Sequence, residues 1–232
     1  MGDLAPEKEM AIRKLSSGFF ITFEGTEGAG KSTQITRLAE RLEEKGLEVV
    51  VLREPGGTVI GERIRSLLKD PVEGKGMTAV SELLLMNAAR AQLVEEIIRP
   101  ALRKGQIVLC DRFYDSTVVY QGHGRGVPLN RVMPVIEMAV GECQPDLTLL
   151  LRTSVGTSER RRSVRDTASG AGGRKDRFES EDNGFFQKIE QGFDACAKDN
   201  PDRIKVIDAE GSIDEVANRL WLPVLDALGM AR

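Results

Sequence analysis

The feature that most constrains this chain is a glycine-rich octapeptide that separates a short apolar run from an amphipathic segment. The octapeptide, at 25–32, reads GTEGAGKS and fits the pattern GxxxxGK(S/T). The apolar run occupies 19–23, and from Ile35 onward apolar residues recur at the i, i+3, i+4 and i+7 spacing of one helix face. Glycines let backbone N–H groups converge on phosphate oxygens, and the following helix adds the positive end of its dipole. The sequence therefore predicts a strand, loop and helix that bind a nucleoside triphosphate.

The polar side chains at this loop have separate expected roles. Lys31 reaches the β- and γ-phosphates, and the Ser32 hydroxyl binds Mg²⁺. Asp111 follows another apolar run, at the carboxyl edge of the predicted sheet where ligands bind, and holds Mg²⁺ through water. We expect nine consecutive residues to contact the triphosphate: Gly25, Thr26, Glu27, Gly28, Ala29, Gly30, Lys31, Ser32 and Thr33.

Apolar runs of strand length alternate with amphipathic segments along the chain. We expect five strands, at 19–23, 49–52, 106–110, 147–151 and 204–207. Beyond the helix that follows the glycine-rich loop, helical spacing predicts further helices at 79–104, 130–142, 184–199 and 212–228. This alternation predicts an α/β fold, with a parallel sheet and helices on both faces. The length of 232 residues suits one domain, at 18–232, after an extension at 1–17.

One segment departs from the alternation. Residues 166–183 are rich in Gly, Ser and charge, which predicts a mobile loop, and long loops often serve as lids. Residues 159–177 hold seven Lys/Arg against three Asp/Glu, so the segment is strongly basic in an otherwise acidic chain. We place the lid at about 159–183.

Composition excludes several classes of protein. A net charge of −3 does not indicate a general basic face for nucleic acid. No apolar run approaches the ~20 residues that span a bilayer, and 1–17 lack the apolar core of a signal peptide. Three cysteines without a CxxC pair indicate buried free thiols in a reducing compartment. We expect a cytoplasmic protein without nucleic-acid or membrane partners.

Two arginines indicate how the triphosphate is used. Arg112 follows Asp111, and Arg53 ends the second predicted strand, directly before a turn that contains Pro-Gly-Gly. Both lie at the same predicted sheet edge, where two guanidinium groups suit a doubly charged phosphate monoester. The sequence contains neither an NKxD-type guanine signature nor an LSGGQ motif, which excludes GTPases and ABC-type ATPases. A nucleotide-dependent switch remains an alternative, although a switch needs no paired acceptor arginines.

Together these motifs resemble those of bacterial thymidylate kinases. The matching segments come in the family's order and cover most of 19–228: FEGTEGAGKS, REPGGT, LLLMNAARAQLVEEIIRPAL, DRFYDSTVVYQG, PDLTLLL and DRFE. The resemblance implies a P-loop kinase fold with a mobile lid, which transfers the γ-phosphoryl group of ATP to dTMP in dTTP biosynthesis. It also implies Mg²⁺ as cofactor and a homodimer. The alternative is another nucleoside monophosphate kinase, or a deoxynucleoside kinase with Glu54 as its base.

The resemblance further implies roles for residues of the acceptor site. Glu27 matches the acidic position that reaches the 3′-hydroxyl of the sugar, and Tyr120 crowds a 2′-hydroxyl. Arg53 and Arg112 match the clamp on the acceptor phosphate, and Arg90 matches the residue that hydrogen-bonds a thymine carbonyl. The full set implied for dTMP is Glu27, Arg53, Met86, Arg90, Arg112, Ser116, Thr117, Tyr120 and Gln121.

The sequence also departs from the family pattern. Met86 stands where members usually stack a Phe on the base, and Glu190-Gln191-Gly192-Phe193 replaces an Arg-x-Gly-Tyr pattern. Some members of the family carry an arginine in the phosphate loop beside its acidic residue, whereas the loop at 25–32 has none, so we expect catalytic cations from the lid, namely Arg165 and Arg174, in addition to Lys31, Arg53 and Arg112. The alternative is that the basic segment is a solvated loop without a catalytic part.

Overall fold

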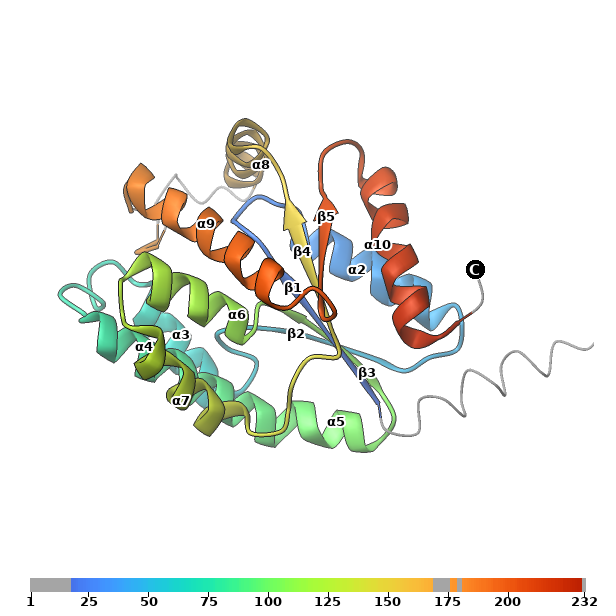
Figure 1. The fold of residues 1–232 in the computed structure, drawn as a ribbon, viewed down its shortest axis with the longest axis horizontal. Helices are drawn as coiled ribbons and strands as arrows, with labels where there is room; N and C mark the ends of the chain where they lie inside the picture. The colour runs from blue at the N-terminus through green and yellow to red at the C-terminus, as the bar shows by residue number, and fades with distance from the viewer. Residues whose placement is uncertain (1–17, 169–175, 179–180, 231–232) are drawn as a thin grey trace, which may run out of the picture.

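The computed structural model describes residues 18–168, 176–178 and 181–230. Five parallel strands form one sheet in the order β2-β3-β1-β4-β5, which confirms the predicted sheet (Figure 1). The strands are β1 (Phe19–Glu24), β2 (Val49–Arg53), β3 (Ile107–Asp111), β4 (Leu147–Arg152) and β5 (Ile204–Asp208). Every strand ends one residue later than its apolar run, and in each case the added residue is charged.

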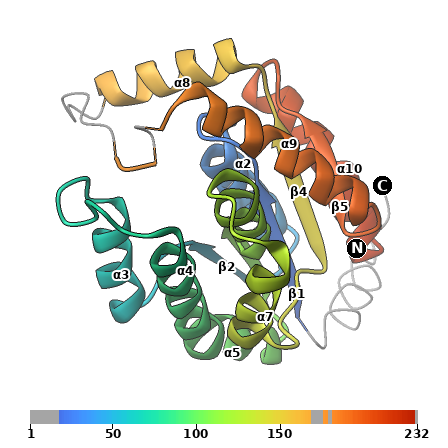
Figure 2. The ribbon, with the colours of Figure 1, turned by 60° about the vertical axis from the view of Figure 1, so that its left-hand side comes forward.

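Helices cover both faces of the sheet, as Figures 1 and 2 show. On one face lie α2 (Lys31–Glu43) and α10 (Ile213–Leu228). The other face carries α4 (Ala79–Leu93), the π-helical η1 (Val94–Ile98), α5 (Arg99–Arg103), α7 (Leu129–Val140) and α9 (Asn183–Asp199). Two further helices, α3 (Val59–Lys69) and α8 (Val155–Ala168), lie toward the carboxyl edge of the sheet.

Alternate side chains of each strand point to opposite faces of the sheet, so each strand contributes to two cores. Ile21 pairs with Leu109 of β3 and packs with α2 and α10 in one core. Phe20 pairs with Val108 and packs in the second core, with α4, η1, α5 and α7. Because successive side chains of a strand point to opposite faces, a strand buried on both sides reads as one continuous apolar run.

Short polar residues fix where several helices begin. The side chains of Thr58, Thr78 and Asp182 each accept a hydrogen bond from a backbone N–H in the first turn that follows. Ser212 and Glu215 form a reciprocal capping box at the start of α10. Across the described residues, no helix has the length and apolar character needed to cross a membrane.

Three segments differ from the expectations or extend them. The predicted helix at 79–104 is a continuous run of α4, η1 and α5 that ends at Arg103. Helical structure also follows β3 directly, in α6 (Tyr114–Thr117) and the π-helical η2 (Val118–Gly124), where we predicted none. Of the expected lid, 159–168 belong to α8, whereas 169–175 and 179–180 fall outside the described residues, as does the extension at 1–17.

Candidate active site

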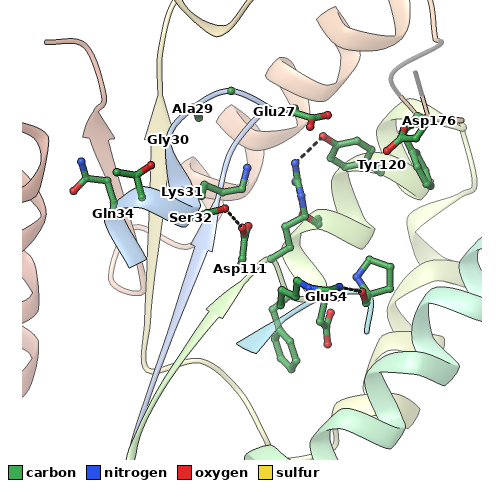
Figure 3. A pocket seen from close by; sticks show the side chains of 18 of the residues that line it. Glu27, Ala29, Gly30, Lys31, Ser32, Gln34, Glu54, Asp111, Tyr120 and Asp176 are labelled. Atoms are coloured by element: carbon green, nitrogen blue, oxygen red, sulfur yellow. Dashed lines mark hydrogen bonds between the residues drawn. The ribbon is translucent and has the colours of Figure 1, made fainter. Parts of the chain in front are cut away.

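The carboxyl ends of three neighbouring strands meet in a row at the sheet edge. Arg53 of β2 pairs with Asp111 of β3, and Asp111 pairs with Phe23 of β1, two positions before the glycine-rich loop begins at Gly25. A cavity of about 610 Å³ opens there. It is lined by all nine residues expected to bind dTMP and by seven of the nine expected at the triphosphate, Glu27, Gly28, Ala29, Gly30, Lys31, Ser32 and Thr33 (Figure 3).

The glycine-rich loop passes close to α8. Gly28 has a left-handed φ of 81°, and a Cβ atom placed there would lie 2.5 Å from the carbonyl oxygen of Ser158. Gly25 and Thr26 do not line the cavity, but their carbonyl oxygens accept hydrogen bonds from Lys31 Nζ, at 3.1 and 3.0 Å. Burial, reinforced by the charge of Arg112, lowers the pKa of Lys31 to about 8. An anion beside Lys31 would therefore stabilise its charged form.

The two residues expected at the metal lie together. Ser32 Oγ donates a hydrogen bond of 3.0 Å to Asp111 Oδ2, and both side chains line the cavity beside Lys31 (Figure 3). A hydroxyl and one carboxylate are oxygen ligands of the kind that Mg²⁺ takes when substrate phosphates and water complete its coordination. Among the described residues, no group of three or more His, Cys, Asp or Glu side chains could hold a metal by itself. The residues present therefore fit a Mg²⁺ ion bound jointly with a nucleotide.

The two candidate acceptor arginines are held by different partners. Arg53 donates to Glu62 Oε2 over 3.0 Å, and its side chain is 49% exposed. Arg112 has a left-handed φ of 71°, which is uncommon for a residue with a side chain. Its Nη1 donates to Ser116 Oγ over 2.9 Å and its Nη2 to Tyr120 Oη over 3.3 Å. Both guanidinium groups are thus held at the cavity wall.

The electrostatics of Arg112 favour its charged form. Burial opposes the charge, but the neighbouring Tyr120, Glu24 and Asp111 outweigh burial and raise the pKa of Arg112 above its ordinary value. A permanently charged guanidinium suits a phosphate dianion.

Arg90 lies on the floor of the cavity and is only 2% exposed. Its Nε donates to Glu54 Oε2 over 2.8 Å, its Nη1 to Asn87 Oδ1 and Thr117 Oγ1, and its Nη2 to the carbonyl oxygen of Phe113. In this arrangement protein groups surround the guanidinium, so Arg90 supports the wall of the cavity as well as lining it.

Two more of the expected acceptor residues line the same pocket. Met86 lies one helical turn before Arg90 on α4, hence on the same face. Gln121 donates from Nε2 to Glu82 Oε1 over 2.7 Å and is 1% exposed. Its side chain therefore packs into the wall.

Aromatic side chains pack around Tyr120 at the cavity wall. The Tyr120 ring makes edge-to-face contacts with Phe178, Phe185 and Phe193, at centroid distances of 6.2, 6.1 and 6.4 Å. Burial raises the pKa of Tyr120, and the charge of Glu27 adds to that effect. Phe178 brings the described part of the DRFE motif to the cavity wall.

Several residues that line the cavity or contact its wall were missed in the sequence. On α3, Arg65 and Lys69 are four apart and share one face, a spacing that could have identified them. Arg161 and Arg162 of α8 also line the cavity. Arg161 donates to the carbonyl oxygens of Ala29, Ala209 and Gly211. Glu24, which is buried at the end of β1, was not predicted as a site residue because it directly follows an apolar run.

The expected lid arginines are not placed by the structure. Arg174 and the side chain of Arg165 lie outside the part of the chain that is described. The described part of the segment is anchored: Arg177 donates to the carbonyl oxygens of Leu68 and Lys69, and it forms an ion pair of 2.6 Å with Glu82. At the departure at 190–193, Phe193 stands in place of Tyr, is buried and packs edge-to-face against the Tyr120 ring, while the retained Gly192 leaves no room for a Cβ beside the His123 ring.

Charge and topology together define the class of protein. The cavity is lined by eight Lys or Arg side chains and four Asp or Glu side chains. A phosphate loop, an oxygen pair suited to Mg²⁺ and two arginines on the adjoining strand ends are the parts of a P-loop phosphotransferase.

Comparison with known proteins narrows that class. A family model described as thymidylate kinase matches residues 23–220. The thymidylate kinase of Syntrophotalea carbinolica is 49% identical over 91% of this chain and 97% of its own, and that of Pseudomonas fluorescens is 49% identical over 88% and 93%. A crystal structure of thymidylate kinase from Ehrlichia chaffeensis, 32% identical, aligns with a TM-score of 0.71 over 90% of this chain and 99% of its own. The chain belongs to the thymidylate kinase family.

Proposed function

We propose that the chain transfers the γ-phosphoryl group of ATP to dTMP in this cavity, and that it supplies dTDP for dTTP synthesis. The observation that carries the proposal is the row formed by Arg53, Asp111 and Phe23 at adjacent strand ends. This row puts Arg53, and Arg112 directly after Asp111, beside the phosphate loop, so two polyanions can be held next to each other.

The acceptor half of the cavity takes dTMP. Arg53 and Arg112 bind its phosphate, and a phosphate monoester is already a dianion near neutral pH, so the attacking oxygen needs no base. Met86 covers one side of the thymine ring, and Arg90 lies where a thymine carbonyl would end. Tyr120 and Glu27 border the sugar, where Tyr120 leaves no room for a 2′-hydroxyl. Ser116, Thr117 and Gln121 complete the wall.

The donor half takes ATP. Backbone N–H groups of the loop at 25–32 and Lys31 hold the β- and γ-phosphates, and Ser32 and Asp111 hold Mg²⁺. When bound, Mg²⁺ would neutralise the negative charge that develops on the leaving phosphate oxygen. The new bond joins the dTMP phosphate oxygen to the γ-phosphorus while the bond to the β-phosphate oxygen breaks.

Cations around the transferred group stabilise its charge. Besides Lys31, Arg53 and Arg112, the candidates are Arg165 and Arg174 of the expected lid, and Arg161 at the edge of the loop. Arg161 also adjoins Ala209 and Ile213, an apolar wall suited to the ATP base.

The structure gives the deoxynucleoside kinase alternative little support. That reaction needs a free carboxylate near a 5′-hydroxyl, and Glu54 is buried in an ion pair with Arg90. Turnover of ATP with a panel of nucleosides and monophosphates distinguishes the two activities. We expect dTMP to give the highest kcat/KM. Equal turnover of dTMP, dCMP and dGMP, or preference for thymidine, would contradict the proposal.

A homodimer is the proposed assembly. The adjacent helices α3, α4 and α7 carry exposed apolar side chains, among them Ile60, Leu84 and Met133 at 53%, 53% and 47% exposure. Patches of this kind mark protein interfaces. Light scattering should give twice the chain mass, and Leu84→Glu should reduce it. A monomeric wild type would contradict the dimer.

For localisation we propose the cytoplasm, because Cys110, Cys143 and Cys196 are all buried free thiols.

A further inference from the structure

Glu24 is an acidic residue in an apolar environment. It is the last residue of β1 and is only 1% exposed, while the preceding residues of the strand are Phe, Phe, Ile, Thr and Phe. A buried carboxylate is costly unless donors satisfy it, so its partners indicate what the residue does.

Within the described residues, the hydrogen bonds of the Glu24 carboxylate all go to the segment that follows β3. Oε1 accepts from the backbone N–H of Phe113 over 2.8 Å and of Ser116 over 3.2 Å. Oε2 accepts from Ser116 Oγ over 2.6 Å. The carboxylate therefore fixes the turn that leads from Arg112 into α6, and it orients one hydroxyl.

That hydroxyl holds the acceptor arginine. Ser116 Oγ donates its hydrogen bond to Glu24 and accepts one from Arg112 Nη1 over 2.9 Å. Arg112 itself has a left-handed φ of 71° between β3 and α6, a backbone conformation that needs support from its surroundings. Glu24 supports the backbone of Arg112 through the N–H of Phe113, the next residue, and it supports the Arg112 side chain through Ser116.

The backbone of Glu24 belongs to the other half of the site. Its carbonyl carbon is bonded to Gly25, the first residue of the phosphate loop, and its Cα pairs with Leu150 of β4 in the centre of the sheet. One residue thus joins the phosphate loop covalently and reaches Arg112 through the Ser116 hydroxyl.

We infer that Glu24 is a positioning residue, which holds Arg112 in place relative to the phosphate loop through Ser116. The inference rests on the acceptor role proposed above for Arg112. It predicts that loss of the carboxylate misplaces the acceptor clamp while the donor loop still binds ATP.

A double-mutant cycle on the full chain tests this role. We would measure kcat and the KM values for dTMP and ATP in wild type, Glu24→Gln, Arg112→Ala and the double variant. The amide of Gln keeps the size of the side chain but cannot accept from Ser116 at both positions. We expect Glu24→Gln to raise the dTMP KM about tenfold or more, as for loss of a hydrogen bond to a charged group, with the ATP KM changed less than about twofold. In the Arg112→Ala background the same change should have almost no further effect.

The matched control is Thr148→Val. Thr148 is also buried on this sheet, where it bonds Thr22 and Arg203, but it has no contact with Arg112. Thr148→Val should reduce stability and leave both KM values unchanged. Ser116→Ala, which removes the hydroxyl between Glu24 and Arg112, should also raise the dTMP KM.

The possible outcomes distinguish the role of Glu24 from that of Arg112. If Arg112→Ala leaves the dTMP KM unchanged, the acceptor assignment itself is wrong. If Arg112→Ala raises the dTMP KM but Glu24→Gln does not, only the role of Glu24 is overturned. Simple additivity of the two changes would also overturn the role of Glu24, because a residue that acts through Arg112 has nothing to act on once Arg112 is removed.

Discussion

Arg90 and Glu54 form an ion pair of 2.8 Å in which the two side chains are 2% and 3% exposed. The residues are 36 positions apart, yet they join the turn after β2 to α4, which lines the cavity. Since Arg53 precedes Glu54 directly, the ion pair also anchors the backbone that carries one of the two arginines proposed to bind the acceptor phosphate. The proposed sites for the base and for the acceptor phosphate are therefore linked by one buried contact.

The first prediction concerns this contact. Arg90→Met should lower the free energy of unfolding by about 3–5 kcal/mol, because it leaves Glu54 buried without its counter-charge. It should also weaken dTMP binding. The double variant Arg90→Met with Glu54→Leu should recover part of the lost stability but not dTMP binding. Urea denaturation and dTMP titration measure the two effects, and full stability in Arg90→Met would refute the importance of the pair.

Arg112→Ala should raise the dTMP KM and lower kcat, with little change in ATP binding. A charged contact to a phosphate that also stabilises the transition state is worth roughly 2–4 kcal/mol in kcat/KM. Steady-state kinetics measure the loss. Arg41→Ala is the control, because Arg41 lies over the Trp221 ring at 4.1 Å and does not line the cavity. Unchanged dTMP kinetics would remove Arg112 from the site.

Met86→Phe should preserve or tighten dTMP binding. A thioether already covers an aromatic ring through its polarisable sulfur, and a phenyl ring would replace it by stacking. Isothermal titration with dTMP measures the change, and Met86→Ala, which removes the cover, should weaken binding. A strong loss of affinity in Met86→Phe would show that the pocket cannot hold base and phenyl ring together.

Binding of ATP should take up a proton at alkaline pH. The pKa of Lys31 is lowered to about 8 by burial, so at about pH 9 most Lys31 side chains are neutral in the free protein. Triphosphate charge restores the ammonium form, and calorimetry in buffers of different ionisation enthalpy should detect close to one proton taken up. At about pH 6.5, and in Lys31→Met at either pH, this contribution should vanish. Equal proton uptake in Lys31→Met would show that a group other than Lys31 takes up the proton.

The stability of the protein should fall relative to Glu24→Gln as pH rises. Burial, and then the charge of Asp115, raises the pKa of Glu24 from 4.5 to about 7, against the opposing charge of Arg112. Lys31, from α2, also faces Glu24 and carries positive charge below about pH 8.

The sign of the effect follows from proton binding. Below about pH 4.5 both folded and unfolded states hold the proton, so the Glu24 contribution is fully present. Between about pH 4.5 and 7 unfolding releases the proton, so rising pH favours the unfolded state, by about 3 kcal/mol in total at ~1.4 kcal/mol per pKa unit. Denaturation midpoints of wild type and Glu24→Gln across this window measure the difference. A constant difference would contradict the raised pKa.

The strand ends show what the sequence could and could not predict. Apolar runs located all five strands, but each run stops where backbone pairing continues for one more residue. The residues added this way include Arg53 and Asp111, which line the cavity, and Glu24, which bonds its wall. A criterion based on apolarity cannot include a charged residue whose burial depends on partners from another strand.

The segment after β3 was harder to predict for a different reason. Residues 118–124 contain two glycines and form a π-helical turn, whose i→i+5 hydrogen bonds leave no spacing signal in an apolar pattern. The individual residues Thr117, Tyr120 and Gln121 were nonetheless identified through motif resemblance. Their contacts, such as Gln121 with Glu82, join positions 39 apart and follow only from the packed fold.

The strand order has a consequence for how this site can change. Strands β2 and β3, which end at Arg53 and Asp111, lie on one side of β1, and β4 and β5, which lead into Arg161 and Ala209, lie on the other. Apart from Glu27 and residues 176–178, the residues proposed for the monophosphate therefore lie at 53–121, and apart from Asp111 those proposed for the triphosphate lie outside this stretch. Substitutions at 53–121 that spare Asp111 would then change the preference for the monophosphate while the residues proposed to hold the triphosphate stay the same.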